Sequence, residues 1–309
     1  MNGLEIAERF YREYGAPMLR EQFPEWEGKI AVGLCGSGSE CLGYDDERSR
    51  DHDFEPGFCL FIPEETEMDS RTAFRLERAY SALPREFLGL RRLKIQPAGG
   101  ARHGVIRRGD FWEQKTGSRE GVLSLQAWLR IPEQYLLEAT NGKIFRDDEG
   151  SFSAVRARLA ALPEPVRLKK LAGRLFLAYQ AGSYNLPRAA LRGDEGASAL
   201  CAQEFARHAV AALFLIHRRY LPYYKWVFRA LRELPGEEET AALFLRLWNE
   251  PLERESFMEQ ISALLCERLC STGLLAAPLY DLERCAYRIN DQIDDPALRC
   301  ENILMGVEG

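Results

Sequence analysis

The stretch that decides the fold combines GSECLG (residues 38–43), SRDHD (residues 49–53) and FCLFI (residues 58–62). A Gly-Ser turn is followed by two aspartates that stand just ahead of an apolar run typical of a buried strand. Because residues i and i+2 of an extended segment point to the same face, Asp51 and Asp53 can direct two carboxylates at one point. Two hard oxygen donors on one face suit Mg²⁺ that also carries phosphates, and a glycine-rich turn offers backbone N–H groups to such phosphates. The pattern predicts a site that handles a nucleotide or phosphoryl group.

The same motif resembles the signature of the DNA polymerase beta-like nucleotidyltransferase superfamily, which includes the aminoglycoside nucleotidyltransferases. The family pattern is G-S-x-x-x-G followed by D-x-D on a strand. Gly38, Ser39 and Gly43 match the first part, and Asp51 with Asp53 match the second. The resemblance implies an α/β nucleotidyltransferase domain with a mixed sheet flanked by helices.

A longer string, GSGSECLGYDDERSRDHDF (residues 36–54), also resembles a poorly characterised bacterial family that is known mainly as a domain of unknown function. This wider resemblance includes YNLPRAALRGD (residues 184–194) and YYKWVFRAL (residues 223–231), so it extends over most of the chain. Gly36-Ser37 offers a second register for the Gly-Ser pair, which ranks lower because no glycine follows it at the family spacing.

The superfamily resemblance implies a reaction: Mg²⁺-dependent transfer of a nucleoside monophosphate from a nucleoside triphosphate (NTP), such as ATP, to an acceptor hydroxyl. Asp51 and Asp53 would be the catalytic metal ligands of a two-metal site. Gly38 and Ser39 would bind the nucleotide phosphates. Lys225 resembles a triphosphate-contacting lysine that aminoglycoside nucleotidyltransferases carry on a C-terminal helix. The acceptor stays open, with a small molecule favoured over a protein side chain or a nucleic-acid end.

The family usually supplies a third carboxylate from a later strand, and here the sequence departs from the pattern. The strand expected over residues 103–108 contains no acidic residue. Glu55, Asp110 and Glu113 are the nearest candidates to replace it. Asp110 has an alternative role as the N-cap of the helix that begins FWEQ.

A polar cluster interrupts the apolar helices of the second half of the chain. Arg188 and Arg192 are four residues apart and can present a bidentate pair to a phosphate or carboxylate. Glu204 and His208 share a helix face at the same spacing. The alternative is an interhelical salt-bridge network that joins Arg188, Arg192, Asp194 and Glu204, with a hydrogen-bonded histidine. The predicted pocket residues are Asn185, Asp194, Glu204 and His208.

Composition and charge limit the class of protein. The 309 residues are 46% hydrophobic and 28% charged, as in soluble globular proteins. The net charge of −6 argues against a chain dominated by non-specific nucleic-acid binding. No apolar run approaches the roughly 20 residues that span a bilayer, so no membrane association is expected. Eight scattered cysteines without a C-x-x-C pair indicate a reducing cytoplasm.

The distribution of helix and strand patterns predicts two domains. Residues 1–148 alternate helix and strand and form the nucleotidyltransferase-like α/β domain. Residues 149–309 contain long helical patterns and form an all-α helical bundle. A second hypothesis keeps this fold without turnover: a catalytically degenerate nucleotide-binding or regulatory protein, similar to an antitoxin, favoured by the missing third carboxylate.

Overall fold

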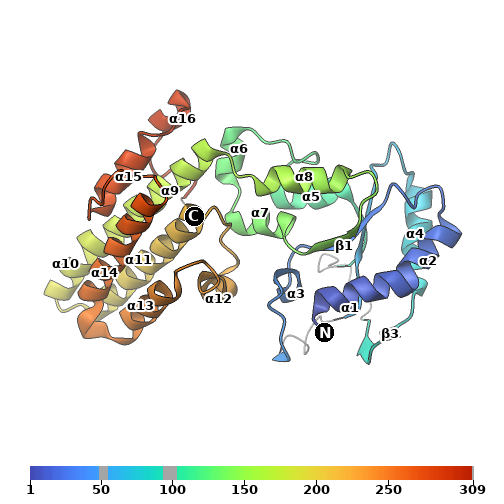
Figure 1. Ribbon diagram of the computed structural model, residues 1–309, viewed down its shortest axis with the longest axis horizontal. Helices are drawn as coiled ribbons and strands as arrows, with labels where there is room; N and C mark the ends of the chain where they lie inside the picture. The colour runs from blue at the N-terminus through green and yellow to red at the C-terminus, as the bar shows by residue number, and fades with distance from the viewer. Residues whose placement is uncertain (49–54, 93–102, 308–309) are drawn as a thin grey trace. The chain divides into compact units, whose positions relative to one another are not determined.

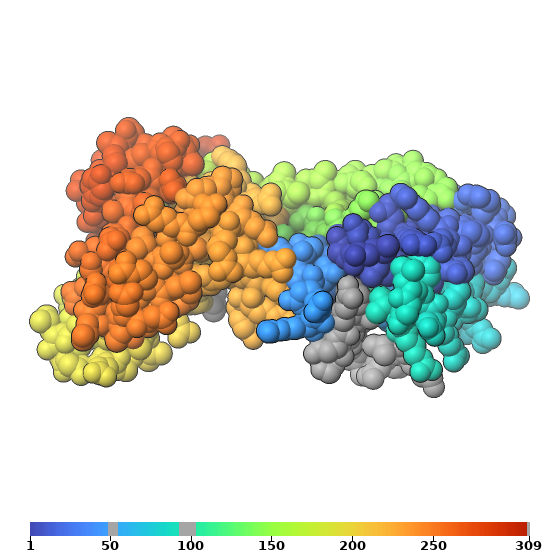
Figure 2. All heavy atoms as spheres, turned by 60° about the horizontal axis from the view of Figure 1, so that its bottom comes forward, coloured from blue at the N-terminus to red at the C-terminus, as the bar shows by residue number. Residues whose placement is uncertain are grey.

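The computed structural model describes residues 1–48, 55–92 and 103–307 (Figure 1). The grey atoms in Figure 2 belong to the rest of the chain. Asp51 and Asp53 are among these and lie outside the described residues. The structure is mixed α/β, with one small mixed sheet and with helices prevailing toward the C-terminus, as predicted.

The chain divides into two compact units whose boundaries differ from the predicted one. Unit 1 comprises Met1–Leu123 and Tyr135–Ala161, and unit 2 comprises Ser124–Gln134 and Leu162–Gly309. The predicted boundary after residue 148 falls inside unit 1, because the following helix packs its Phe152 there with other aromatic rings. The chain therefore passes between the units more than once.

Four strands form the sheet of unit 1 in the order β5-β2-β1-β6. β1 (Ala31–Leu34) is antiparallel to β2 (Cys59–Ile62) and to β6 (Lys143–Arg146). β2 is parallel to β5 (Gly104–Arg107). Outside this sheet, β3 (Glu86–Phe87) and β4 (Leu90–Arg91) form a short antiparallel pair.

Helices cover both faces of this sheet because side chains alternate along each strand. Val32, Leu60 and Ile62 pack into a core with the N-terminal helices and α4. Phe61 points the other way and stacks on Phe152 of α8, with ring centroids 4.2 Å apart. The helical segments of unit 1 are α1 (Gly3–Phe10), a π-helical turn (Tyr11–Gly15), α2 (Ala16–Gln22), α3 (Ser39–Leu42), α4 (Ser70–Ala82), α5 (Arg108–Thr116), most of α7 (Glu133–Thr140) and α8 (Ser151–Ala160).

All regular secondary structure in the described residues of unit 2 is helical. Its central helix, α9 (Glu164–Tyr179), packs against α11 (Glu195–Ile216) and α15 (Leu282–Asn290). The other segments are α6 (Leu125–Arg130), the start of α7 (Glu133–Thr140), a π-helical segment (Gln180–Asn185), α10 (Leu186–Leu191), a 3₁₀ turn (Tyr224–Trp226), α12 (Val227–Leu231), α13 (Glu238–Asn249), a second 3₁₀ turn (Pro251–Glu253), α14 (Arg254–Ser271) and α16 (Pro296–Cys300).

Charged side chains are buried along α9 and are paired within unit 2. Arg167 donates to Glu164 and to the Leu215 carbonyl oxygen. Lys170 donates to the Ile131 carbonyl oxygen at 2.8 Å. These contacts satisfy charges that would otherwise be destabilising in an apolar interior.

Among the described residues, α11 alone is long and apolar enough to cross a membrane by length and composition. In its apolar window, 67% of the residues are buried inside the structure. This burial is that of a helix in the core of a soluble protein.

Candidate functional site

One end of the sheet of unit 1 collects loops from distant parts of the chain. The last residues of β1 pair with the first residues of both antiparallel neighbours: Gly33 with Cys59, and Leu34 with Lys143. β5 runs parallel to β2 and so begins at the same end, where Cys59 pairs with Gly104. This loop end of the sheet comprises residues 35–40, 55–58, 103 and 141–142.

The Gly-Ser turn has the predicted place directly after β1. α3 begins at Ser39, and Gly38 precedes it with φ of +135°, which favours glycine. The Asn141 side chain holds the turn: its Oδ1 accepts from the Gly36 N–H at 2.9 Å, and its Nδ2 donates to the Gly36 carbonyl oxygen at 2.9 Å. The backbone of the turn is therefore fixed by a residue 105 positions away.

Gly142 allows the segment before β6 to lie close to the backbone at the end of β1. Its φ is +68°, and an added Cβ would overlap the carbonyl oxygen of Leu34. The Gly142 N–H also donates to the Cys41 carbonyl oxygen at 2.9 Å. The pair Asn141-Gly142 thus ties both sides of the Gly-Ser turn to the start of β6.

Glu40 is a carboxylate at this site that the sequence reasoning missed. Its side chain is buried, and a Cβ added to Gly38 would lie 2.5 Å from Glu40 Oε1. A bare anion bound over Gly38 would therefore meet a carboxylate. The only sequence signal was its position inside the G-S-x-x-x-G pattern, and the pattern accepts any residue at that position.

Glu55 also lies at the loop end of the sheet. Its Oε1 is 3.2 Å from Nδ1 of His103, and both side chains are largely buried. The contact joins the segment that enters β2 to the residue that precedes β5. Of the three predicted substitutes for the third carboxylate, this one is at the end of the sheet where the Gly-Ser turn lies.

The structure places Asp110 and Glu113 toward the other end of the sheet, because α5 follows the last residue of β5. Arg119 binds both side chains, Asp110 Oδ1 at 2.5 Å and Glu113 Oε2 at 3.0 Å. It also binds Glu64, which follows the end of β2, at 2.6 Å. A four-residue strand separates this cluster from the loop end by about 10 Å.

The alternative role of Asp110 was wrong. α5 begins at Arg108, so the N-cap is Arg107 and Asp110 lies within the first turn. In that position its negative charge is favourable to the helix dipole without capping an N–H group.

Two basic side chains, Arg156 and Lys115, lie close to Cys35 at the start of the Gly-Ser turn. Arg156 Nη2 donates to the Thr140 carbonyl oxygen at 2.9 Å, while its Nη1 is buried without a hydrogen-bond partner in the described part of the chain. Burial raises the pKa of the adjacent Cys35 thiol to about 11, although Arg156 and Lys115 oppose the shift. Cys35 is therefore an unreactive thiol, and Arg156 contributes positive charge close to the turn.

The predicted metal ligands Asp51 and Asp53 lie outside the described residues. Within residues 1–48, 55–92 and 103–307, no group of three or more His, Cys, Asp and Glu side chains could hold a metal ion.

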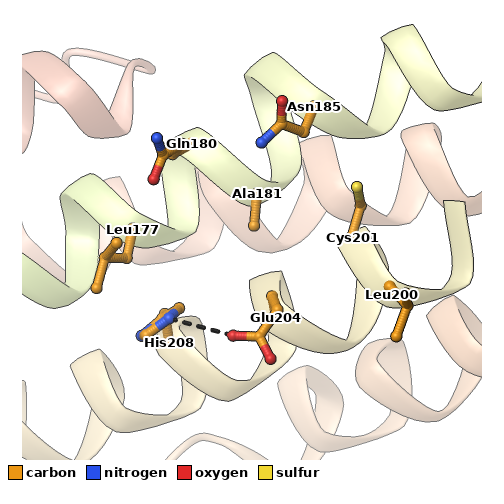
Figure 3. A pocket seen from close by; sticks show the side chains of 8 residues that line it. All are labelled: Leu177, Gln180, Ala181, Asn185, Leu200, Cys201, Glu204 and His208. Atoms are coloured by element: carbon orange, nitrogen blue, oxygen red, sulfur yellow. Dashed lines mark ion pairs between the residues drawn. The ribbon is translucent and has the colours of Figure 1, made fainter. Parts of the chain in front are cut away.

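Unit 2 contains a separate cavity of about 240 Å³ (Figure 3). It is formed where the end of α9 and the following π-helical segment pack against α11. Three of the four predicted pocket residues line it together: Asn185, Glu204 and His208. The remaining lining residues are Leu177, Gln180, Ala181, Leu200 and Cys201.

His208 forms the buried floor of this cavity, which we call the α9–α11 pocket. Arg174 Nη1 is 3.2 Å from Nδ1 of His208, and Arg207 Nη2 is 3.3 Å from Nε2. Both guanidinium groups can only donate. Nε2 lies 3.5 Å from Glu204 Oε2. Burial, Arg174 and Arg207 lower the pKa of His208 to about 3. The imidazole is therefore neutral at physiological pH.

The proposed arginine pair is exposed in unit 2. Arg188 packs over the Tyr184 ring at 3.6 Å from its centroid, and Arg192 is the C-cap of α10. Asp194 caps α11 by accepting from the Ala197 N–H at 2.9 Å. In the described part of the chain neither arginine forms an ion pair, because Glu204 pairs with Arg207 and His208 instead. The predicted network of Arg188, Arg192, Asp194 and Glu204 was therefore wrong, whereas the hydrogen-bonded histidine of that alternative is confirmed. Asp194 has a helix-end role and does not line the pocket.

Lys225 is exposed in a 3₁₀ turn just before α12. Its ammonium group lies 5.1 Å from the centroid of the Trp226 ring. The structure thus leaves this side chain open to solvent, in unit 2, on a turn rather than within the predicted helix.

Comparison with known families identifies one match. Residues 128–227 match a family model described as "Domain of unknown function (DUF4037)". The matched segment covers less than half of the chain and includes every residue that lines the α9–α11 pocket, together with Lys225. The chain matches no curated protein and no solved structure.

Proposed function

We propose that the chain is a Mg²⁺-dependent nucleotidyltransferase that transfers a nucleoside monophosphate from an NTP to an acceptor hydroxyl. The observation that carries the proposal is the strand register of unit 1. Pairing of Gly33 with Cys59 brings the loop after β1 and the segment before β2 to one end of the sheet. The Gly-Ser turn belongs to the first of these, and Asp51 and Asp53 precede the second in sequence.

The charges at this end favour a cation-bridged phosphate over a bare one. Glu40 and Glu55 are acidic groups at the loop end, and Arg156 lies behind it. A carboxylate beside Gly38 repels a free phosphate. A divalent cation is attracted both by the carboxylate and by the phosphate. Carboxylate oxygens from Asp51 and Asp53 are the donor set that Mg²⁺ prefers.

Each residue has a defined part in the proposed reaction. Asp51 and Asp53 would hold Mg²⁺, which when bound neutralises charge on the triphosphate. The Ser39 hydroxyl and the backbone N–H groups of the turn would orient the phosphates. Glu55, oriented by His103, would accept the proton of the attacking hydroxyl. The predicted nucleotide contacts of Arg188, Arg192 and Lys225 stay a prediction.

The test is turnover with and without the two aspartates. The full-length protein is incubated with Mg²⁺, each labelled NTP and a set of hydroxyl-bearing small molecules, and pyrophosphate release is measured. The Asp51→Ala/Asp53→Ala variant should lose at least about 10³-fold in rate, since it lacks the metal ligands. A wild-type protein that binds no NTP in the presence of Mg²⁺ would overturn the proposal.

A matched set of variants tests the role of Glu55. Glu55→Gln should lower the rate by about 10²-fold if it accepts the proton. Asp110→Asn and Glu113→Gln are controls, because Arg119 holds both acids toward the opposite end of the sheet. Equal losses in all three variants would remove Glu55 from the mechanism.

A second candidate function is nucleotide binding without turnover, as in a regulatory or antitoxin-like protein. It is favoured by the capture of Asp110 and Glu113 by Arg119, which leaves fewer acids for a third metal ligand. Mg²⁺-dependent NTP binding without pyrophosphate release above the double variant would support it. We place either function in the cytoplasm, because all eight cysteines are free thiols.

A further inference from the structure

We propose that the α9–α11 pocket binds a nucleobase that carries an exocyclic amino group, such as adenine or cytosine. The site lies within unit 2 and does not depend on the proposed triphosphate site. Its volume of about 240 Å³ matches a ligand of this size. A cavity of about 150 Å³ accommodates benzene, so this one accommodates roughly ten non-hydrogen atoms.

The backbone of the pocket is irregular in a way that directs two carboxamides into it. Residues Gln180–Asn185 form a π-helical segment, in which the Leu186 N–H bonds back five residues to the Ala181 carbonyl oxygen. This spacing brings residues five apart toward the same face, so Gln180 and Asn185 both line the pocket (Figure 3). In a regular α-helix these two side chains would point in different directions.

The packing of this segment on α11 is close because position 182 is glycine. An added Cβ at Gly182 would lie 2.6 Å from the Phe205 ring and 2.9 Å from Met258 Cγ. A larger residue would push the π-helical segment away from α11. The two walls of the pocket are therefore held at a fixed separation.

The hydrogen-bonding groups of the pocket are of both kinds and are available. The carboxamides of Gln180 and Asn185 each offer donors and an acceptor, and neither bonds to another described residue. Glu204 directs Oε2 to Arg207, at 2.8 Å, and toward His208, at 3.5 Å. Its Oε1 has no partner in the described part of the chain and can accept from a ligand.

The charges of the pocket favour a neutral ligand. Arg207 balances Glu204, and the His208 imidazole is neutral. A cationic ligand would be repelled by Arg174 and Arg207, and an anionic one by Glu204. Leu177, Ala181 and Leu200 supply apolar contact for a planar ring.

These properties together match the edge of an amino-bearing nucleobase. Asn and Gln carboxamides pair with a ring nitrogen and an adjacent amino group through two hydrogen bonds, and a carboxylate accepts from the amino group of cytosine. The amino group would donate to Glu204 Oε1, and the ring nitrogen would accept from a carboxamide. A carbonyl oxygen in place of the amino group would face the carboxylate.

The test compares bases that differ at that group and at the adjacent ring nitrogen, which accepts in adenine and cytosine and donates in hypoxanthine and uracil. Binding of adenine against hypoxanthine, and of cytosine against uracil, is measured calorimetrically with the full-length protein. We expect at least about tenfold tighter binding of the amino-bearing member of each pair, because a site built to accept a donor rejects an analogue that lacks it. Equal affinities within both pairs, or no binding of any base up to about 5 mM, would overturn the assignment.

Variants locate the binding. Gln180→Ala, Asn185→Ala and Glu204→Gln should each weaken adenine binding at least about fivefold. Gln203→Ala is the matched control, since Gln203 is an exposed carboxamide on the same helix that does not line the pocket. Unchanged binding in all three pocket variants would overturn the proposal, as would an equal loss in the control. The Asp51→Ala/Asp53→Ala variant should keep adenine binding, which separates this site from the proposed catalytic one.

Discussion

The loop end of the sheet in unit 1 and the α9–α11 pocket in unit 2 are built by different means. At the loop end, backbone geometry is fixed by hydrogen bonds and by glycines, as where Asn141 holds Gly36 in both directions. In the pocket, side-chain protonation is fixed by burial and by neighbouring charges, as where burial and then Arg174 and Arg207 hold His208 neutral. The first site should therefore be sensitive to backbone substitution, and the second to pH.

The largest effect expected is at Gly142. Gly142→Ala would place Cβ against the Leu34 carbonyl oxygen at a φ of +68°, so we expect a loss of about 3 kcal/mol in the free energy of unfolding. Gly150→Ala is the matched control, since Gly150 has the same φ with nothing within 4 Å of an added Cβ. That variant should lose only about 1 kcal/mol. Equal losses by urea denaturation would show that the close contact with β1 is unimportant.

The second effect tests the electrostatic control of the pocket. The pKa of His208 is about 3 in the folded protein and 6.5 when unperturbed. The unfolded state therefore binds the proton first as pH falls, and the folded protein loses stability between pH 6.5 and 3. At pH 5 the loss amounts to about 2 kcal/mol.

His208→Asn isolates this contribution, because its Oδ1 can still accept from Arg174. We expect the variant to lose less stability than the wild type between pH 6.5 and 5, measured by urea denaturation at each pH. The groups facing the imidazole are Arg174 from α9, with Glu204 and Arg207 from α11. Parallel pH profiles would show that His208 is not held neutral.

A smaller effect is expected from the side chain that fixes the Gly-Ser turn. Asn141→Ala removes two hydrogen bonds to Gly36 and should lower the free energy of unfolding by about 1.5 kcal/mol. Asn141→Asp keeps the acceptor for the Gly36 N–H but loses the donor, so its loss should differ from that of the alanine variant. The proposed NTP binding should weaken in both, whereas adenine binding in unit 2 should not change.

The smallest effect has the opposite sign and lies in unit 2. Gly196 is in the first turn of α11, where an added Cβ meets only ordinary contact, 3.5 Å from Asp194 Oδ1. Gly196→Ala should raise the free energy of unfolding by about 0.5 kcal/mol through helix propensity. Gly182→Ala should instead be destabilising because of the Phe205 ring, and thermal unfolding of both variants compares them directly. Destabilisation by both would contradict the packing argument for the pocket.

Local sequence patterns predicted several features of the two sites. The spacing of Glu204 and His208 placed them on one helix face, and the structure brings them within 3.5 Å in one cavity. The break after β1 at the Gly-Ser turn was also predicted correctly. Both predictions depend on residues close in sequence, where helix and strand periods apply.

Features that depend on distant residues were not predicted. Gln180 was missed because the π-helical segment, rather than an α-helical period, turns it into the pocket. Arg119 took Asp110 and Glu113 because α5 follows the far end of β5. Glu40 was missed because its side chain folds back over Gly38. That position depends on the positive φ of Gly38, which no periodic pattern encodes.

By itself, the sequence determined the types of element and the residues with chemical potential: a Gly-Ser turn, two aspartates before a strand, and polar side chains within apolar helices. Only the tertiary structure decided which of them meet. Antiparallel pairing of β1 with β2 set the end of the sheet at which the loops converge, and Asn141 fixed that end from 105 residues away. Such contacts arise from hydrogen-bond register and packing between remote segments, which no local period in the chain specifies.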